Sequence, residues 1–250
     1  DNGVKIFGPD GYKIADSIER EIERLVLESD LNSVLANPNE IGRSKRIEDA
    51  EGRYVVYAKN AFPLEYTLEG LRIVLDCANG AAYKVAPAIF GELGAEIIVT
   101  GNHPNGFNIN DKVGALYPSK LAESVQEYRA DVGISLDGDA DRVVMVDEKG
   151  RIVNGDHVLA ICGVDMASRG VQPHKTIVYT QMSNFGLDKL MREYGIKVIR
   201  TDVGDKYVVE EMRKNGYMLG GEQSGHIIFL DQCTTGDGCI AALNVLAVMK

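Results

Sequence analysis

The stretch that decides the fold is residues 71–100, which reads LRIVLDCANGAAYKVAPAIFGELGAEIIVT. It opens with a β-branched apolar run at 71–75, continues as a helical pattern at about 82–93, and ends with a second such run at 95–99. Short apolar runs that alternate with helical patterns are typical of βαβ units on a mostly parallel sheet. The stretch therefore predicts an α/β fold.

The same alternation continues along the chain and defines two similar blocks. The first block adds a helix at about 119–128 and a strand at 131–136. The second block has strands at 176–179, 197–199 and 217–219 and helices at about 185–194 and 206–214. A helical pattern at about 156–168 joins the two blocks. We therefore expect an α/β fold class of tandem βαβ-type domains with mostly parallel mixed sheets.

The first 66 residues have a different pattern. Apolar positions Ile18, Ile22 and Leu25 have helical spacing, and Asp16 is suited to cap that helix. The residues after this helix are polar, lack a clear period and are punctuated by proline, which is typical of a linker or a domain edge.

The composition excludes several classes of protein. The chain has 27 Lys and Arg against 37 Asp and Glu, a net charge of −10, and no basic run, which argues against nucleic-acid binding. Its apolar stretches are shorter than the roughly 20 residues that a membrane span needs. We therefore expect no membrane partner. The four cysteines show no C-x-x-C spacing and form no disulfide framework, so we expect a reducing, cytoplasmic setting.

The strongest local motif is DGDADR at 137–142, directly after a predicted strand. Asp137, Asp139 and Asp141 would repel one another unless a cation held them together. Carboxylate oxygens favour Mg²⁺ or Ca²⁺, and Mg²⁺ usually shares its shell with phosphate oxygens. The motif therefore predicts a metal site with a phosphorylated partner. Arg142 could hold that phosphate, or it could simply balance the three acids.

A calcium-binding EF-hand loop is the alternative for this motif. Such a loop needs glycine at its sixth position, where this sequence has Arg142, and it needs helices on both sides. The flanking residues 132–136 and 143–146 have the pattern of strands. We therefore expect Mg²⁺ on a strand-loop-strand.

A second polar loop, GEQSGH at 221–226, follows the third strand of the second block. Glu222 and Ser224 are groups that hydrogen-bond sugar hydroxyls, and His226 could move a proton near neutral pH. His226 could equally be an ordinary turn residue. Ligands of open α/β sheets collect beyond the carboxyl ends of the strands, so the two loops would line one cleft unless they are only turns.

Two further glycine-containing turns precede helices. In TDVGDK at 201–206, Gly204 and the helix N-terminus could receive an anion, or Asp205 could be the N-cap of the helix. In TTGDG at 234–238, which opens the last apolar helix, we favour a cap.

Taken in order, these motifs resemble the α-D-phosphohexomutase family. The resemblance is carried by segments 1–11 (DNGVKIFGPDG), 137–142, 201–207 and 221–226, the last continuing into 234–238. It spans essentially the whole chain. One such motif would be weak, but four in sequence order are hard to obtain by chance.

The resemblance implies a four-domain enzyme in which a phosphoserine gives its phosphoryl group to a hexosamine phosphate and a bisphosphate intermediate then reorients. Lys5 and His226 would be the general acid and base candidates, and Arg142 would stabilise the transferring group. By the same resemblance the metal ligands for Mg²⁺ would be Asp137, Asp139 and Asp141, and the substrate-binding residues would be Gly204, Asp205, Glu222 and Ser224.

The resemblance also implies a domain division. Residues 1–66 would be the C-terminal part of a first α/β domain with a linker, 67–170 a second domain with the metal loop, and 171–250 a third domain with the sugar-binding loop. A mutase for glucose or mannose phosphates and a non-catalytic metal- and sugar-phosphate-binding module remain open alternatives. A homodimer also remains open.

We predict that this 250-residue chain cannot turn over substrate by itself. In the family the phosphoserine lies in a Ser-His-Asn-Pro stretch upstream of the Asp-Asn-Gly segment, and a phosphate-binding loop lies in a fourth domain. The sequence begins at that segment with Asp1 and its last helical pattern is still running at Lys250, so we expect a piece of a longer protein. An assay of the purified chain should show no mutase turnover, and measurable turnover would contradict the prediction.

Overall fold

The computed structural model describes residues 4–28, 35–172 and 174–250. Asp1–Gly3, the start of the first motif, lie outside these described residues. The chain divides into two compact units, one over residues 2–50 and one over residues 51–250. Each unit is described by itself.

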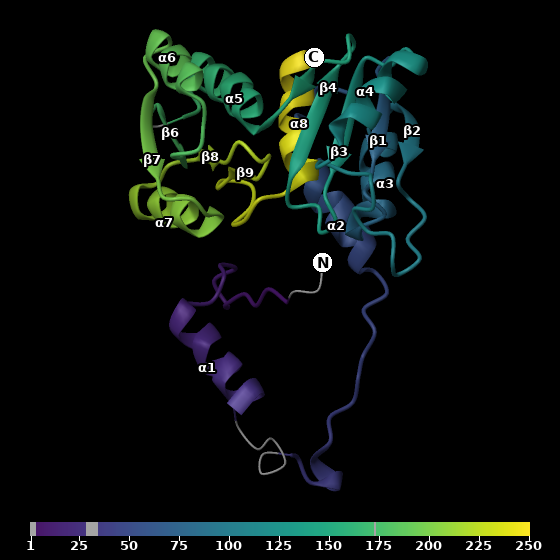
Figure 1. The fold of residues 1–250 in the computed structure, drawn as a ribbon, viewed down its shortest axis with the longest axis vertical. Coiled ribbons are helices and arrows are strands. Elements are labelled where there is room, and N and C mark those ends of the chain that lie inside the picture. The colour runs from purple at the N-terminus through teal and green to yellow at the C-terminus, as the bar shows by residue number, and fades with distance from the viewer. Residues whose placement is uncertain (1–3, 29–34, 173) are drawn as a thin grey trace. The chain divides into compact units, whose positions relative to one another are not determined.

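The larger unit contains a five-stranded sheet in the order β2-β1-β3-β4-β5 (Figure 1). Its strands are β1 (Arg72–Asp76), β2 (Glu96–Thr100), β3 (Val132–Leu136), β4 (Val143–Asp147) and β5 (Ile152–Val153). The central strand β1 is parallel to β2 and β3, whereas β4 and β5 are antiparallel to their neighbours. The first block is therefore a mixed sheet with a parallel centre.

A second sheet repeats this plan in the order β7-β6-β8-β9. Its strands are β6 (Thr176–Thr180), β7 (Lys197–Thr201), β8 (Leu219–Gly221) and β9 (Ile227–Phe229). Strand β6 is parallel to β7 and β8, and β9 is antiparallel to β8. The predicted α/β class of tandem mixed sheets is confirmed.

Helices cover both faces of each sheet. They are α2 (Ala50–Lys59), η3 (Ala81–Tyr83), α3 (Val85–Glu92), α4 (Pro118–Glu127), α5 (Gly155–Arg169), α6 (Phe185–Glu193), α7 (Asp205–Asn215) and α8 (Gly238–Met249). Leu121 and Val125 of α4 form a small core with the first sheet, and Val208 and Met212 of α7 form its counterpart on the second. The opposite faces share one large core.

Helix α8 joins the two sheets. It contacts β3 and β4 of the first sheet and β9 of the second, and it lies beside α5 (Figure 1). Most of its residues are buried, as expected of a helix that is apolar all round. No helix among the residues that the structure describes is long and apolar enough to cross a membrane.

The interpretation of the region before residue 66 as one helix and an irregular linker is wrong in part. The predicted helix is present as α1 (Asp16–Glu28), and Pro38–Glu40 form the short helix η2. However, Ala50–Lys59 form the additional helix α2, which buries Val55 and Ala58. Its apolar side chains do not gather on one side, because Gly52 and charged residues interrupt them, so the period is weak.

The remaining boundaries agree with the sequence within about two residues, the usual uncertainty of helix and strand ends. The largest shift is in the third strand of the second block, predicted at 217–219 and found as β8 at Leu219–Gly221. The predicted strand stopped too early because β8 ends in two glycines, and glycine is rare in strand interiors. The domain division at 66/67 and 170/171 stays a prediction.

The third strand of each sheet carries a glycine against which a helix packs. A Cβ atom added to Gly133 of β3 would lie 2.7 Å from Val125 of α4, and one added to Gly220 of β8 would lie 2.8 Å from the backbone oxygen of Val178 and from Val208 of α7. The close approach of helix and sheet therefore depends on glycine at both positions.

We predict that Gly220→Ala lowers the free energy of unfolding by about 1–3 kcal/mol, because backbone and side-chain atoms must move apart. Gly133→Ala should cost less, since only side chains of α4 must shift. The matched control is Gly52→Ala in α2, where an added Cβ meets nothing within 4 Å. That change should stabilise by roughly 0.5–1 kcal/mol. Urea unfolding measures all three, and an unchanged Gly220→Ala midpoint would contradict the packing argument.

Candidate active site

The metal loop, residues 137–142, is the connection of the antiparallel β3-β4 hairpin. Ala140 has a left-handed backbone, with φ of 62°, which is unfavourable for a residue other than glycine. Two hydrogen bonds hold it there: its amide donates to Asp137 O at 3.1 Å, and its carbonyl accepts from Gly238 N of α8 at 2.9 Å. The loop conformation is therefore fixed from outside as well as by the hairpin.

The three predicted metal ligands come together in this loop. Each of Asp137, Asp139 and Asp141 offers one carboxylate oxygen, and these oxygens lie within 4.8 Å of one another. Asp137 is fully buried, Asp141 is partly buried and Asp139 is exposed. This donor set of hard oxygens, open on one side, fits a divalent cation that keeps part of its shell for a substrate.

Arg142 is bound to the most buried of these acids. Its Nε lies 2.7 Å from Asp137 Oδ2, and its backbone amide donates to Asp137 Oδ1 at 3.1 Å. Burial raises the pKa of Asp137, although these hydrogen bonds act in the opposite direction. Burial would lower the pKa of Arg142, but the nearby carboxylates outweigh it and the pKa is raised. Charge balance, the alternative for Arg142, is therefore part of its role.

The segment that follows β1, which includes Gly80 and Ala81, packs against the backbone of the metal loop. Ala81 N donates to Gly138 O at 2.8 Å, and a Cβ atom on Gly138 would lie 2.7 Å from Asn110 Nδ2. A side chain on Gly80 would collide with the Gly138 backbone. Backbone therefore packs directly on backbone at this point.

The sugar loop, residues 221–226, is joined to the metal loop by backbone hydrogen bonds. Val143 N donates to Gly225 O at 3.0 Å, and Arg142 and His226 form an isolated antiparallel β-bridge. Gly225 needs a backbone with φ of 98°, and a Cβ there would collide with Val143. The two motifs, which lie about 80 residues apart in sequence, thus form one site.

His226 lies between one acid of the metal loop and one at the start of α7. Its Nδ1 is 3.5 Å from Asp141 Oδ2, and its Nε2 is 3.8 Å from Asp205 Oδ2. The side chain is 4% exposed, and Nε2 has no hydrogen-bond partner among the described residues. Burial would lower the pKa of His226, but the hydrogen bond and charge of Asp141, with the charge of Asp205, outweigh it and the pKa is raised. His226 is thus a buried residue between two acids, and its role in proton transfer stays a prediction.

Glu222 connects the sugar loop to the turn before α7. Its Oε1 accepts from Gly204 N at 3.2 Å, and its Oε2 accepts from Ser224 Oγ at 3.4 Å. Gly204, with φ of 131°, is itself the N-cap of α7, and Asp205 is the first helical residue. The alternative that Asp205 caps this helix is therefore wrong, and its carboxylate faces His226 instead.

Nine of the ten predicted site residues fall on these connected loops. They are Asp137, Asp139, Asp141, Arg142, Gly204, Asp205, Glu222, Ser224 and His226. Lys5 belongs to the separate unit over residues 2–50, and its role stays a prediction.

Sequence reasoning missed residues that hold the metal loop in place. The predicted cap before α8 is confirmed, because Asp237 accepts from Ile240 N at 3.0 Å. The same carboxylate also accepts from Tyr54 OH of α2 at 2.9 Å. These two bonds fix Asp237 and with it the next residue, Gly238. The amide of Gly238 in turn donates to the carbonyl of Ala140 in the metal loop. Tyr54 was missed because the sequence did not predict helix α2, on which this residue lies.

Asp76, at the end of β1, is a second such residue. It is 3% exposed, and it accepts from Ala78 N at 2.9 Å and from Gly114 N at 2.7 Å. It ties together the loops that support Gly138. Its position at the carboxyl end of a buried strand was the signal that could have revealed it.

The family models for phosphoglucomutase/phosphomannomutase match this chain twice: alpha/beta/alpha domain II over residues 52–150 and alpha/beta/alpha domain III over residues 154–250. A curated phosphoglucosamine mutase from Bdellovibrio bacteriovorus is 73% identical over all 250 residues, which is 55% of that protein. The chain belongs to the α-D-phosphohexomutase family. It spans about half the length of the curated relatives it matches.

Solved structures agree with this fold. A phosphoglucomutase/phosphomannomutase family protein from Burkholderia thailandensis superposes with a TM-score of 0.78 at 25% identity, covering 94% of this chain and 49% of that one. An N-acetylphosphoglucosamine mutase from Aspergillus fumigatus, solved in complex with GlcNAc-6P and magnesium, gives a TM-score of 0.62 at 19% identity, covering 83% and 48%.

We predict that the metal loop binds one divalent cation and that Asp139→Ala removes the binding. Asp139 is the variant of choice because it is exposed, whereas removing buried Asp137 would also unbalance Arg142. The matched control is Glu148→Gln, which removes one exposed acid six residues after Arg142. Isothermal titration with Mg²⁺ and spin-resonance titration with Mn²⁺ should show loss of the site only in Asp139→Ala. Equal binding by both variants would refute the assignment.

Proposed function

We propose that the protein to which this chain belongs is a Mg²⁺-dependent mutase that interconverts glucosamine 6-phosphate and glucosamine 1-phosphate through a phosphoserine and a bisphosphate intermediate. The observation that carries the proposal is the backbone junction between the metal loop and the sugar loop, which brings Arg142 and His226 together beside the three aspartates. Phosphoryl transfer needs charge neutralisation, alignment and a proton acceptor at one place.

Asp137, Asp139 and Asp141 would hold the metal ion, which when bound supplies positive charge to the phosphoryl oxygens. Arg142 contributes a second positive charge that is already oriented, because Asp137 fixes its guanidinium. A fixed guanidinium stabilises charge on a transferring phosphoryl group without having to reorganise during the reaction.

His226 would accept the proton of the attacking sugar hydroxyl. As the hydroxyl oxygen forms its bond to phosphorus, the bond from phosphorus to the serine oxygen breaks and the proton passes to Nε2. That atom makes no hydrogen bond among the described residues, so no other partner already occupies it. Asp141 and Asp205 raise the pKa of His226 and so favour the imidazolium that results.

Glu222 and Ser224 would bind sugar hydroxyls, because both carry oxygens suited to such bonds and both lie on a loop that backbone hydrogen bonds hold in place. Gly204 and Asp205 would contribute from the neighbouring turn. The amino sugar itself is supported by the name of the 73% identical relative, since no contact in the site distinguishes an amino group from a hydroxyl. Magnesium is supported by the carboxylate donor set and by the magnesium in the Aspergillus fumigatus mutase structure.

Lys5 completes the proposal as the general acid that protonates the leaving oxygen. A cytoplasmic location also belongs to the proposal, and the four cysteines are consistent with it because all are free thiols. The partner is a hexosamine phosphate, and a homodimer stays a prediction.

The proposal predicts a substrate preference in the full-length protein. Turnover, measured as kcat/KM, should be highest with glucosamine 6-phosphate and lower with glucose 6-phosphate and mannose 6-phosphate. A preference for a plain hexose phosphate would keep the mutase chemistry but overturn the amino-sugar assignment. Binding of sugar phosphate without turnover of any of the three would favour a binding module instead.

The proposal also predicts which side chain moves the proton. His226→Gln should lower kcat by about 10²–10⁴-fold, the usual contribution of a positioned acid or base. Metal binding by the same variant should be retained, because the carboxylate ligands remain. The matched control is His157→Gln, an exposed histidine on α5. A His226→Gln enzyme with unchanged kcat would exclude the proposed role.

A further inference from the structure

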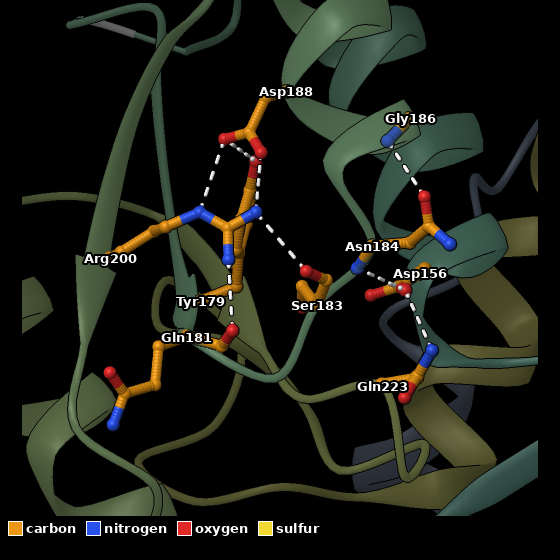
Figure 2. Close-up of polar contacts among 9 residues, drawn as sticks. All are labelled: Asp156, Tyr179, Gln181, Ser183, Asn184, Gly186, Asp188, Arg200 and Gln223. Carbon is orange, nitrogen blue, oxygen red and sulfur yellow. Dashed lines mark hydrogen bonds and ion pairs between the residues drawn. The ribbon is translucent and has the colours of Figure 1, made fainter.

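The loop between β6 and α6, residues 181–184, is held rigidly by Arg200 of β7. The guanidinium donates to Gln181 O and to Ser183 O, both at 3.1 Å, and it pairs with Asp188 of α6 (Figure 2). The Cζ atom of Arg200 also lies over the ring of Tyr179, 5.2 Å from the ring centroid. These contacts fix both the strand end and the loop that leaves it.

Asp156, in the first turn of α5, joins this rigid loop to the sugar loop. Its Oδ2 accepts from Asn184 N at 2.9 Å and from Gln223 Nε2 at 3.2 Å, as Figure 2 shows. Asn184 is the residue after the Arg200-bound Ser183, and Gln223 lies between the two proposed sugar-binding residues. One buried carboxylate oxygen thus connects a fixed loop to the centre of the sugar loop.

The backbone of α5 reinforces this connection. Gly155 N donates to Gln223 O at 3.1 Å, so both the backbone and the side chain of Gln223 are held by the start of α5. A side chain at Gly155 would collide with the carbonyl of Glu222. The sugar loop therefore rests directly on the N-terminus of this helix.

The hydrogen bonds of the Asp156 side chain both go to the two loops. Asp156 is 7% exposed, and its Oδ1 has no hydrogen-bond partner among the described residues. Its Oδ2 accepts from Asn184 of one loop and from Gln223 of the other. Removing the carboxylate would therefore remove a side-chain bond to both loops at once.

We propose that Asp156 is a positioning residue that fixes the sugar loop and so sets the affinity for the sugar phosphate, an inference that rests on the proposed function. Gln223 is the direct neighbour of both Glu222 and Ser224 in the chain. Releasing Gln223 therefore lets both proposed sugar-binding side chains move. The metal loop has separate support from Gly238 and Ala81. Loss of Asp156 should therefore weaken sugar binding and spare metal binding.

The test uses the full-length protein with three variants. Asp156→Ala removes both hydrogen bonds, and its KM should rise on the order of tenfold to a hundredfold, with a smaller change in kcat. Asp156→Asn keeps one oxygen that can accept from both donors, so its KM should stay close to the wild-type value. The matched control is Asp165→Ala, which removes an acid from the other end of α5 and its ion pair with Arg169 but no bond to the sugar loop.

Hydrogen exchange supplies a readout that does not depend on turnover. In Asp156→Ala the amides of Asn184, Glu222 and Gly225 should exchange faster than in the wild type, while the amides of β1 stay unchanged. Asp165→Ala should not accelerate these three amides. If Asp156→Ala does not fold, Gln223→Ala removes the side-chain bond alone and should raise KM in the same direction.

These experiments distinguish failure of the positioning role of Asp156 from failure of the proposed mutase function. Equal KM values for wild type and Asp156→Ala, or equal changes in Asp156→Ala and Asp165→Ala, would overturn the role of Asp156 in an active enzyme. If the wild type turns over no hexose phosphate, the proposed function fails, and hydrogen exchange still decides whether Asp156 positions the loop. Unaltered exchange at Asn184 and in the sugar loop would then refute it.

Discussion

The structure of the site depends on the backbone junction between two hairpin loops from different sheets. Val143 N donates to Gly225 O, and Arg142 pairs with His226, so neither the metal loop nor the sugar loop has an independent position. Strand β3 leads into the metal loop and strand β8 leads into the sugar loop. Both strands end at the carboxyl edge of their sheet, where ligands of α/β proteins bind. The repeated 2-1-3-4 strand order places a polar loop at the same point of each sheet, and α8 packs the two sheets together.

The junction also concentrates negative charge. Carboxylates from the metal loop, from Asp205 and from Glu222 outnumber the cationic groups Arg142 and His226. A phosphate ester would be repelled from such a region in the absence of a bound cation, because like charges a few ångströms apart interact strongly where water is excluded. The same surplus raises the pKa of His226 despite burial. The proposed binding of the metal and the proposed binding of the sugar phosphate would thus be linked through electrostatics.

The sequence predicted the elements and the site residues that local patterns encode. The β-branched runs revealed the strands, and the spacing of Asp137, Asp139 and Asp141 revealed the metal loop, because both depend on neighbours in sequence. The helix α2 was missed since its burial comes from tertiary contacts and not from an apolar period. Asp156 and Tyr54 were missed for a related reason, as their partners lie 67 and 183 residues away.

The bond from Tyr54 to Asp237 has a consequence for how the chain assembles. The hairpin that contains the metal loop can form from adjacent residues, but Ala140 acquires its outer hydrogen bond only when Gly238 is present. During synthesis, α2 emerges far ahead of the segment it will hold. Contacts of such large sequence separation form slowly. The outer hydrogen bond of the metal loop therefore forms only after translation has passed the start of α8, and a polypeptide shortened before that point lacks this bond.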